Sequence, residues 1–167
     1  MARAFRTSAT LLVLCGLVIV FALWGWHAAT APWPAKVDSP ACVDRTVKAG
    51  ERVSPVDVTV SVLNASQREG LARLTLDALG RHHFAMASQG NAPKGTDVAD
   101  AEIWTDDPTS PAAELVQSWI PGSKIVQHRP ATPGITVVLG QQFTHIGGGA
   151  KAVKATDDTT ICSPVVD

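Results

Sequence analysis

Residues 56–63 read VDVTVSVL, and this stretch decides the fold class of the chain. Its valines stand at every second position and alternate with Asp, Thr and Ser, which predicts a strand with one buried face that ends at Asn64. The following Ser66–Glu69 segment has the capping-box pattern, in which each side chain accepts a hydrogen bond from the other residue's amide. We therefore expect a helix directly after the strand, as in an α/β fold.

Two amphipathic helices are predicted. The apolar stripe of the first consists of Leu71, Leu74, Ala78 and Leu79. Gly80 is expected to end that helix in the left-handed conformation. The second helix is expected to begin at Ser110, with Pro111 in its first turn, and to end at Pro121-Gly122. Its stripe consists of Ala112, Leu115, Val116 and Trp119.

The remaining strands surround these helices in the sequence. Strands are expected over residues 84–87, 101–105, 124–127 and 135–139, with a loop over residues 88–100. Since the two helices must cover a sheet, the predicted fold class is α/β: a two-layer sandwich of a four- to five-stranded mixed sheet with two helices. The strand order does not follow from the pattern. Residues 144–167 are expected to form a tail that only Cys162 ties back.

The N-terminal region has the pattern of a membrane anchor. Residues 9–26 read ATLLVLCGLVIVFALWGW, without a charge, and about 20 such residues span a bilayer as a helix. Arg3 and Arg6 precede this run, and the next basic residue is Lys36. The positive-inside rule therefore predicts a cytoplasmic segment over residues 1–8, a single transmembrane helix over residues 9–28 and an extracytoplasmic remainder, in addition to the sandwich.

Two further features belong to this region. Trp24, Trp26 and Trp33 are expected to form an aromatic belt at the outer membrane surface. Residues 29–55, with several prolines, are expected to form an extracytoplasmic stalk. A cleaved signal peptide is the alternative to a retained anchor, because Ala29-Thr30-Ala31 fits a cleavage site.

Cys42 and Cys162 are the cysteines outside the apolar run, which contains Cys15. In an oxidising compartment such a pair is expected to form a disulfide, here enclosing about 119 residues. The alternative, a redox-active pair, is typical of Cys-x-x-Cys spacing, which the chain lacks.

The composition and the motifs restrict the chemistry. The chain has 14 Lys and Arg against 15 Asp and Glu, so no basic field for nucleic acid is expected. No metal-ligand spacing or nucleophile elbow occurs, His82-His83 is expected to be solvated near a helix end, and Asp106-Asp107 is expected to form a turn. We expect no catalytic residues, no metal and no cofactor, and hence a protein that is not an enzyme.

Several short stretches stand out together: residues 60–66 (VSVLNAS), 69–72 (EGLA), 78–79 (AL) with Phe84, 111–113 (PAA) with Leu115, and 135–140 (ITVVLG) before Phe143. In combination they resemble the LytR C-terminal (LytR_C) domain. The resemblance covers residues 56–143. One departure is Gln142, where many family members have an acidic residue. The resemblance implies the stand-alone, membrane-anchored type of this domain, which occurs in actinobacterial proteins of cell envelope integrity and has no assigned activity.

The candidate binding residues lie where the first helix is expected to begin, because free amides at a helix start favour anions such as a phosphate or a uronate. They are Asn64, Ser66, Arg68 and Gly70. A glycine in a helical turn costs about 1 kcal/mol relative to alanine, so either close packing or a nearby ligand is expected to require Gly70.

The expected function is that of a membrane-anchored extracytoplasmic binding module that supports envelope integrity. Its expected partners are cell-wall polymer or envelope proteins of the LytR–CpsA–Psr type. One alternative is an accessory subunit or enzyme in the transfer of lipid-linked glycopolymer to the wall, and another is a scaffold that acts through its membrane helix. Acidic and basic groups that converge in a deep pocket would favour the enzyme.

Overall fold

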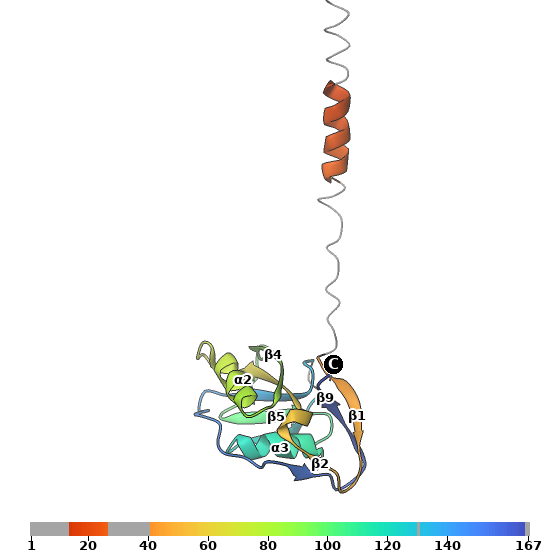
Figure 1. Cartoon of the computed structure of the whole chain (residues 1–167). Helices are drawn as coiled ribbons and strands as arrows, with labels where there is room; N and C mark the ends of the chain where they lie inside the picture. Colours follow the sequence, from red (N-terminus) through yellow and green to blue (C-terminus); the bar gives the residue numbers. More distant parts are fainter. Residues whose placement is uncertain (1–13, 27–40, 130, 166–167) are drawn as a thin grey trace, which may run out of the picture. The chain divides into compact units, whose positions relative to one another are not determined.

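The structure is a computed structural model that describes residues 14–26, 41–129 and 131–165 and divides the chain into two units, Met1–Asp38 and Ser39–Asp167. In the first unit, residues 14–26 form a helix (Figure 1). Within the described part of the chain, no helix has both the length and the hydropathy that a membrane crossing requires. The predicted span of residues 9–28 extends beyond the described residues at both ends and stays a prediction, as do the predictions for residues 1–8 and 29–40.

The second unit is built on a five-stranded mixed sheet of order β4-β3-β7-β5-β6. Its strands are β3 (Thr59–Asn64), β4 (Ala85–Asn91), β5 (Ala101–Thr105), β6 (Lys124–Gln127) and β7 (Ile135–Leu139). Strand β3 is parallel to both of its neighbours, β4 and β7. Strand β5 is parallel to β6 but antiparallel to β7. The mixed sheet is the predicted one, and its order is new information.

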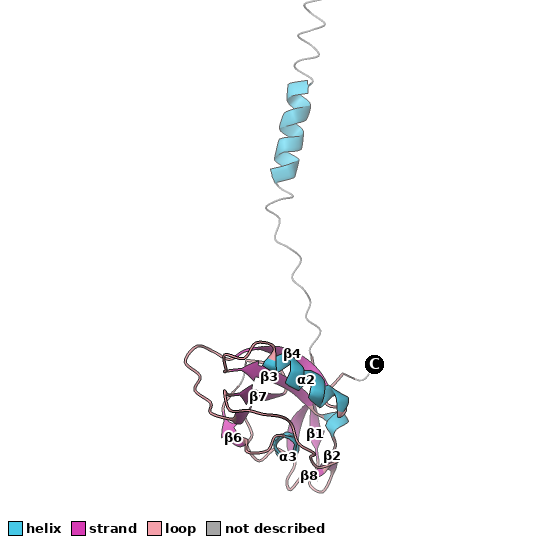
Figure 2. Cartoon of the chain, turned by 90° about the vertical axis from the view of Figure 1, so that its left-hand side faces the viewer, coloured by secondary structure: helices cyan, strands magenta, loops and turns pink. Residues whose placement is uncertain are grey.

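Helix α2 (Leu71–Arg81) connects β3 to β4 (Figure 2). Helix α3 (Pro111–Trp119) connects β5 to β6. Both helices bury side chains in one core with the inward valines of β3 and β7, so they cover the same face of the sheet. The opposite face has a smaller cluster of Val98, Trp104 and Val138. The predicted α/β class with two helices on a five-stranded sheet is therefore confirmed for this unit.

Helix α2 differs from its prediction at its start. The prediction of a capping box at Ser66–Glu69 is wrong, because the helix begins at Leu71. Its N-cap is Gly70, which has a φ of 74°. Ser66 instead takes part in a turn, in which its amide and hydroxyl both donate to Asn64 Oδ1. The short Asn64 side chain thus competes successfully for the groups that a capping box would use.

The buried face and the end of α2 also differ. Leu74 is 67% exposed, and the buried positions are Leu71, Ala72, Thr75, Leu76 and Leu79. Gly80 stays helical, and His83 adopts the left-handed conformation instead. A Cβ at Gly80 would lie 2.5 Å from Met86 Sδ, so the glycine makes room for a side chain of β4.

Helix α3 follows its prediction. Ser110 is its N-cap, Pro111 occupies the first turn, and Ser110 Oγ accepts a hydrogen bond from the Ala112 amide at 3.3 Å. All four residues of the predicted stripe are buried. The strands predicted over residues 101–105, 124–127 and 135–139 are likewise confirmed. The strand predicted over residues 84–87 is longer, because β4 extends to Asn91 and shortens the predicted loop.

The segments that precede the sheet in the sequence pair with the segments that follow it. Strand β1 (Val43–Val47) pairs with β9 (Thr159–Ser163), and β2 (Arg52–Val53) pairs with β8 (Val153–Lys154), both antiparallel. The predictions of a stalk up to residue 55 and of a loose tail from residue 144 are therefore wrong for these strands. Val47, Val53 and Ile161 are buried in the main core, which gives the pairing its apolar support.

A 3-10 turn, η1 (Pro55–Asp57), separates β2 from β3. The strand predicted to begin at Val56 therefore begins at Thr59. The Ser54 amide and hydroxyl donate to Asp57 Oδ2 at 3.0 and 2.6 Å, which stabilises the turn.

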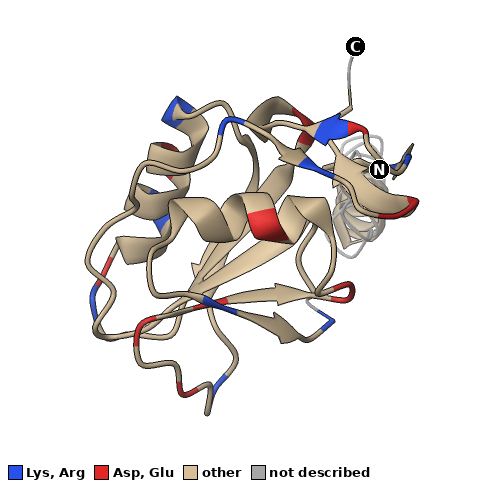
Figure 3. Ribbon diagram, turned by 90° about the horizontal axis from the view of Figure 1, so that it is seen from below, with Lys and Arg blue, Asp and Glu red and all other residues tan. Residues whose placement is uncertain are grey.

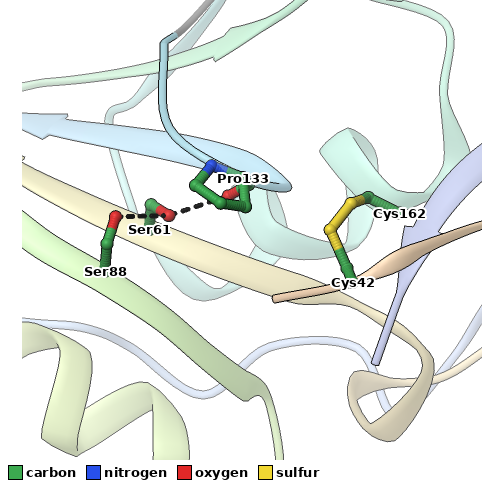
Figure 4. The surroundings of a disulfide bond; sticks show 5 residues. All are labelled: Cys42, Ser61, Ser88, Pro133 and Cys162. Carbon is green, nitrogen blue, oxygen red and sulfur yellow. Dashed lines mark hydrogen bonds between the residues drawn. A yellow bond between two sulfur atoms is a disulfide. The ribbon is translucent and has the colours of Figure 1, made fainter. Parts of the chain in front are cut away.

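The predicted disulfide between Cys42 and Cys162 is present, with a Cα–Cα distance of 5.4 Å (Figure 4). Cys42 directly precedes β1 and Cys162 lies in β9, so the bond joins the two strands of one ribbon. Figure 4 also shows the serines of β3 and β4 nearby, where Ser88 Oγ donates to Ser61 Oγ and Ser61 Oγ donates to the Pro133 carbonyl.

Candidate functional site

The two β-α-β units of the sheet run in opposite directions. Because β5 is antiparallel to β7 while β3 is parallel to it, the carboxyl ends of β3 and β4 lie at one edge and those of β5 and β6 at the other. Ligand sites of open α/β sheets lie outside the carboxyl ends of strands, next to helix starts. The structure has a hollow at each of these two places.

The smaller hollow, of about 310 Å³, lies at the carboxyl ends of β3 and β4. It is lined by Asn64, Ser66, Gln67, Arg68, Glu69, Gly70 and Asn91. The structure thus brings together all the residues predicted as candidate binding residues, although they lie before the helix start and not in it.

The side chains of this hollow are largely engaged with one another. Asn64 Nδ2 donates to the Arg68 carbonyl at 2.7 Å, and the Arg68 amide donates to Ser66 Oγ at 3.1 Å. The Arg68 guanidinium donates to the Phe143 carbonyl. What these side chains leave to a ligand is the charge of the exposed Arg68, with the carboxylate of the exposed Glu69 in the same lining.

The structure shows why position 70 requires glycine. A Cβ at this position would meet no atom within 4 Å, so the expectation of close packing is wrong. Its φ of +74° lies in the left-handed region, which costs other residues about 1–2 kcal/mol. The backbone conformation at the N-cap is what requires glycine.

Gly70→Ala is therefore expected to lower the free energy of unfolding by about 1–2 kcal/mol, because alanine must adopt the left-handed backbone. Urea denaturation of the purified chain measures this loss in the free energy of unfolding. Gly148→Ala is the matched control, since Gly148 has no positive φ and no atom within 4 Å of a Cβ, and it is expected to be neutral or slightly stabilising. Equal stabilities of the two variants would contradict the account of Gly70.

The larger hollow, of about 460 Å³, lies at the carboxyl ends of β5 and β6 and is closed on one side by the β1–β9 ribbon. Its polar residues include Asp44 and Thr160 from the ribbon and Asp106, Asp107, Ser110 and Arg129 from the loops beyond β5 and β6. No pattern in the sequence predicted that these residues come together. Asp44 and Arg129 are far apart in the chain, and no spacing signal could have joined them.

Asp107 is the most constrained group of the larger hollow. Its Oδ1 accepts from the Thr109 hydroxyl at 2.7 Å and from the Thr109 amide at 3.0 Å. Its Oδ2 accepts from the Thr159 hydroxyl of β9 at 3.0 Å. The hydrogen bond from the Thr109 side chain, with those from its amide and from Thr159, lowers the pKa of Asp107 below its ordinary value of 3.8 against the opposing effect of burial. The carboxylate thereby links the ribbon to the loop before α3.

This link predicts a pH dependence. A pKa lowered in the folded state adds stability above the unfolded value of 3.8, and the gain is lost as the pH falls through the folded pKa. Asp107→Asn is expected to cost about 1 kcal/mol at neutral pH, and its difference from the wild type is expected to shrink below pH 3.8. Denaturation over a pH series measures it, with Asp106→Asn as a control that removes a charge but no described hydrogen bond. A difference that is constant with pH would contradict the prediction.

The described residues contain no group of three His, Cys, Asp or Glu side chains that could hold a metal ion. His82 lies at the end of α2 and stacks on Trp119, with ring centroids 4.4 Å apart. Figure 3 shows Lys and Arg interspersed with Asp and Glu on the visible side, without a field of one sign.

Comparison with known families shows that residues 57–143 match the model of the LytR_C family. This family is described as LytR cell envelope-related transcriptional attenuator. No curated protein matches the chain. A similar solved structure is the crystal structure of the soluble domain of a conserved hypothetical secreted protein from Mycobacterium marinum. The two chains are 26% identical, and the match covers 62% of this chain and 79% of the other. The TM-score is 0.49.

Proposed function

Because the chain belongs to the LytR_C family, we propose that it is a membrane-anchored, extracytoplasmic binding module that supports the integrity of the cell envelope. The family description relates this domain to the cell envelope. The proposed partners are cell-wall polymer or envelope proteins of the LytR–CpsA–Psr type, and the proposed source is an actinobacterium.

The observation that carries the extracytoplasmic placement is the disulfide between Cys42 and Cys162. Disulfides persist in oxidising compartments and are rare in the cytosol. Residues 9–26 carry no charge and follow Arg3 and Arg6 in the sequence, which supports a single-pass anchor with the N-terminus in the cytoplasm. Protease added to cells without their wall is expected to digest the Ser39–Asp167 unit, and full protection of this unit would contradict the topology.

The binding role is supported by the smaller hollow, which lies just before the start of α2 and is lined by the exposed Arg68. The charge of Arg68 favours a phosphate or a uronate of a wall polymer, and the Glu69 carboxylate in the same lining opposes it. The full chain in detergent is expected to co-sediment with purified wall polymer, and Arg68→Gln is expected to weaken this severalfold. Arg81→Gln, at the other end of α2, is the matched control. If the wild-type chain neither sediments with polymer nor crosslinks to an envelope protein in intact cells, the binding role is wrong.

A second candidate, an accessory subunit or enzyme in the transfer of lipid-linked glycopolymer, is favoured by the larger hollow, where Arg129 lies with three aspartates. Arg129 forms no ion pair with another described residue. Transfer of glycopolymer in a reconstituted system that depends on the full chain and is lost in Asp106→Asn would support this candidate over the binding module. Replacing residues 9–26 by an unrelated anchor distinguishes both from a scaffold that acts through the membrane helix.

A further inference from the structure

The short ladder that β2 and β8 form places two like charges side by side (Figure 2). Arg52 and Lys154 are direct partners in its antiparallel register, and both are exposed. The other pair of the ladder, Val53 and Val153, packs in the main core. Like charges directly opposite one another destabilise a pair of strands. The β2–β8 ladder therefore carries an unfavourable arrangement of charge on its solvent side.

The acidic side chains next to β2 do not compensate this charge. Glu51 Oε1 and Asp57 Oδ1 both pair with Arg45 Nη2, at 3.4 and 3.6 Å. Arg52 and Lys154, in contrast, form no ion pair and no side-chain hydrogen bond with a described residue. The carboxylates closest in sequence are thus engaged by another arginine, and the cross-strand cations are left to a partner outside the described chain.

Two further lysines extend the pair into a row. Lys48 precedes β2 and Lys151 precedes β8, and both are exposed and form no ion pair with a described residue. Because β2 and β8 are antiparallel, these two lysines lie toward opposite ends of the ladder. The four basic residues therefore follow the ladder as a line of positive charge.

The carboxylates that could oppose this row are fewer. Asp158 Oδ1 accepts a hydrogen bond from the Ala49 amide at 2.8 Å. Asp157, beyond β8, and Glu114, on the helix α3 that contacts β8, are exposed and form no described ion pair. Positive charge thus exceeds the free negative charge along the ladder.

The shape of this surface favours a long anionic partner. Neither of the two hollows is lined by Arg52 or Lys154, so the cations stand on an open surface that would not enclose a small molecule. An anion between the two side chains lowers their mutual repulsion. A chain with anions at intervals gains from several such weak contacts along the row at once.

Resting on the binding role proposed above, we infer that the β2–β8 ladder is a docking surface for an anionic wall polysaccharide. Arg52 and Lys154 bind its carboxylate or phosphodiester groups, and Lys48 and Lys151 attract the chain on either side. This surface lies outside residues 57–143, which match the family model, and belongs to the segments that flank them.

The test uses the full chain in phosphatidylcholine nanodiscs and polygalacturonate coupled to beads as the probe. The chain is expected to sediment with the beads, less so as the salt concentration rises, because binding releases counterions. Methyl esterification of the carboxylates removes the charge of the probe and is expected to weaken binding at least about tenfold.

Variants of the ladder are expected to separate binding from stability. Arg52→Gln and Lys154→Gln should each weaken binding severalfold and raise the urea midpoint, while the double variant should raise the midpoint little further, because either change removes the same repulsion. Lys154→Glu creates a pair of opposite charges, and we expect it to raise the midpoint most and to weaken binding about tenfold.

Two controls keep the charge or remove it elsewhere. Arg52→Lys retains the cation and is expected to hold binding within about twofold. Lys94 is exposed, lies in the loop after β4 and forms no ion pair with a described residue. Lys94→Gln is therefore expected to leave both binding and the urea midpoint unchanged.

Unchanged binding in Lys154→Glu, an equal loss in Lys94→Gln, or equal binding of the methyl ester would overturn the inference. A lower urea midpoint in the ladder variants would overturn it as well, since the loss of binding would then follow from damage to the fold. Stronger binding to phosphatidylglycerol vesicles than to polygalacturonate would assign the surface to a membrane instead.

Sedimentation with purified wall polymer is measured on the same preparations. A wild-type chain that sediments with wall polymer as strongly as its ladder variants do removes only the inference. A wild-type chain that binds polygalacturonate through the ladder, but neither sediments with wall polymer nor crosslinks to an envelope protein, removes the proposed function instead.

Discussion

Serine in place of both Cys42 and Cys162 is expected to lower the free energy of unfolding of the Ser39–Asp167 unit by about 5 kcal/mol. The bond joins residues separated by 120 positions, and loop-closure entropy assigns about 4.7 kcal/mol to a loop of about 100 residues. The ribbon that the bond joins is a two-stranded sheet, which is marginal by itself, so β1 and β9 are expected to separate first.

Urea denaturation followed by a pulse of protease measures this loss on the full chain. The wild type with a reductant is expected to behave like the double variant, and Cys15→Ser is the control, because Cys15 is free. An unchanged midpoint in the double variant would show that the disulfide does not stabilise the unit.

Gly140→Ala is expected to cost about 3 kcal/mol or more, the second-largest effect. Gly140 follows β7, and its amide donates to the Asp100 carbonyl at 2.6 Å. A Cβ at this position would overlap the Val98 carbonyl oxygen and lie 2.6 Å from the Ala99 carbonyl carbon and oxygen. These atoms are backbone, so the clash cannot be relieved by a side-chain rotation.

The damage should spread to the second face of the sheet. Val98 lies in the cluster with Trp104 and Val138, so displacing residues 98–100 is expected to expose Trp104 as well as to lower stability. Pulse proteolysis and hydrogen exchange of the Trp104 amide measure the two effects. Gly148→Ala again serves as control, and equal behaviour of the two variants would contradict the steric account.

The sequence was most informative where a signal is contained within a few residues. Ser110 and Pro111 predicted the start of α3 correctly, because a cap and a proline act on the adjacent turn. At Ser66 the same kind of signal failed, because Asn64 draws its groups into a turn and a left-handed glycine starts α2 later. Two local motifs competed there, and only the packed structure shows which one forms.

The candidate binding residues show the same division. Asn64, Ser66, Arg68 and Gly70 are close in sequence, and the structure does place them around one hollow. The larger hollow was not foreseen, since its walls come from segments about 50 to 120 residues apart, such as those of Asp44, Asp106 and Thr160.

By itself, the sequence determined the α/β class, helix α3, most strands of the sheet and the cysteine pair. These depend on side-chain periodicity, on helix caps and on the two cysteines that stand outside the apolar run. Only the tertiary structure decided the strand order and the pairing of β1 with β9 and of β2 with β8. It also decided the larger hollow, which the β1–β9 ribbon closes on one side. For the two pairings outside the main sheet, the physical reason is that short strands with few apolar residues gain their stability from partners about 100 to 120 residues away.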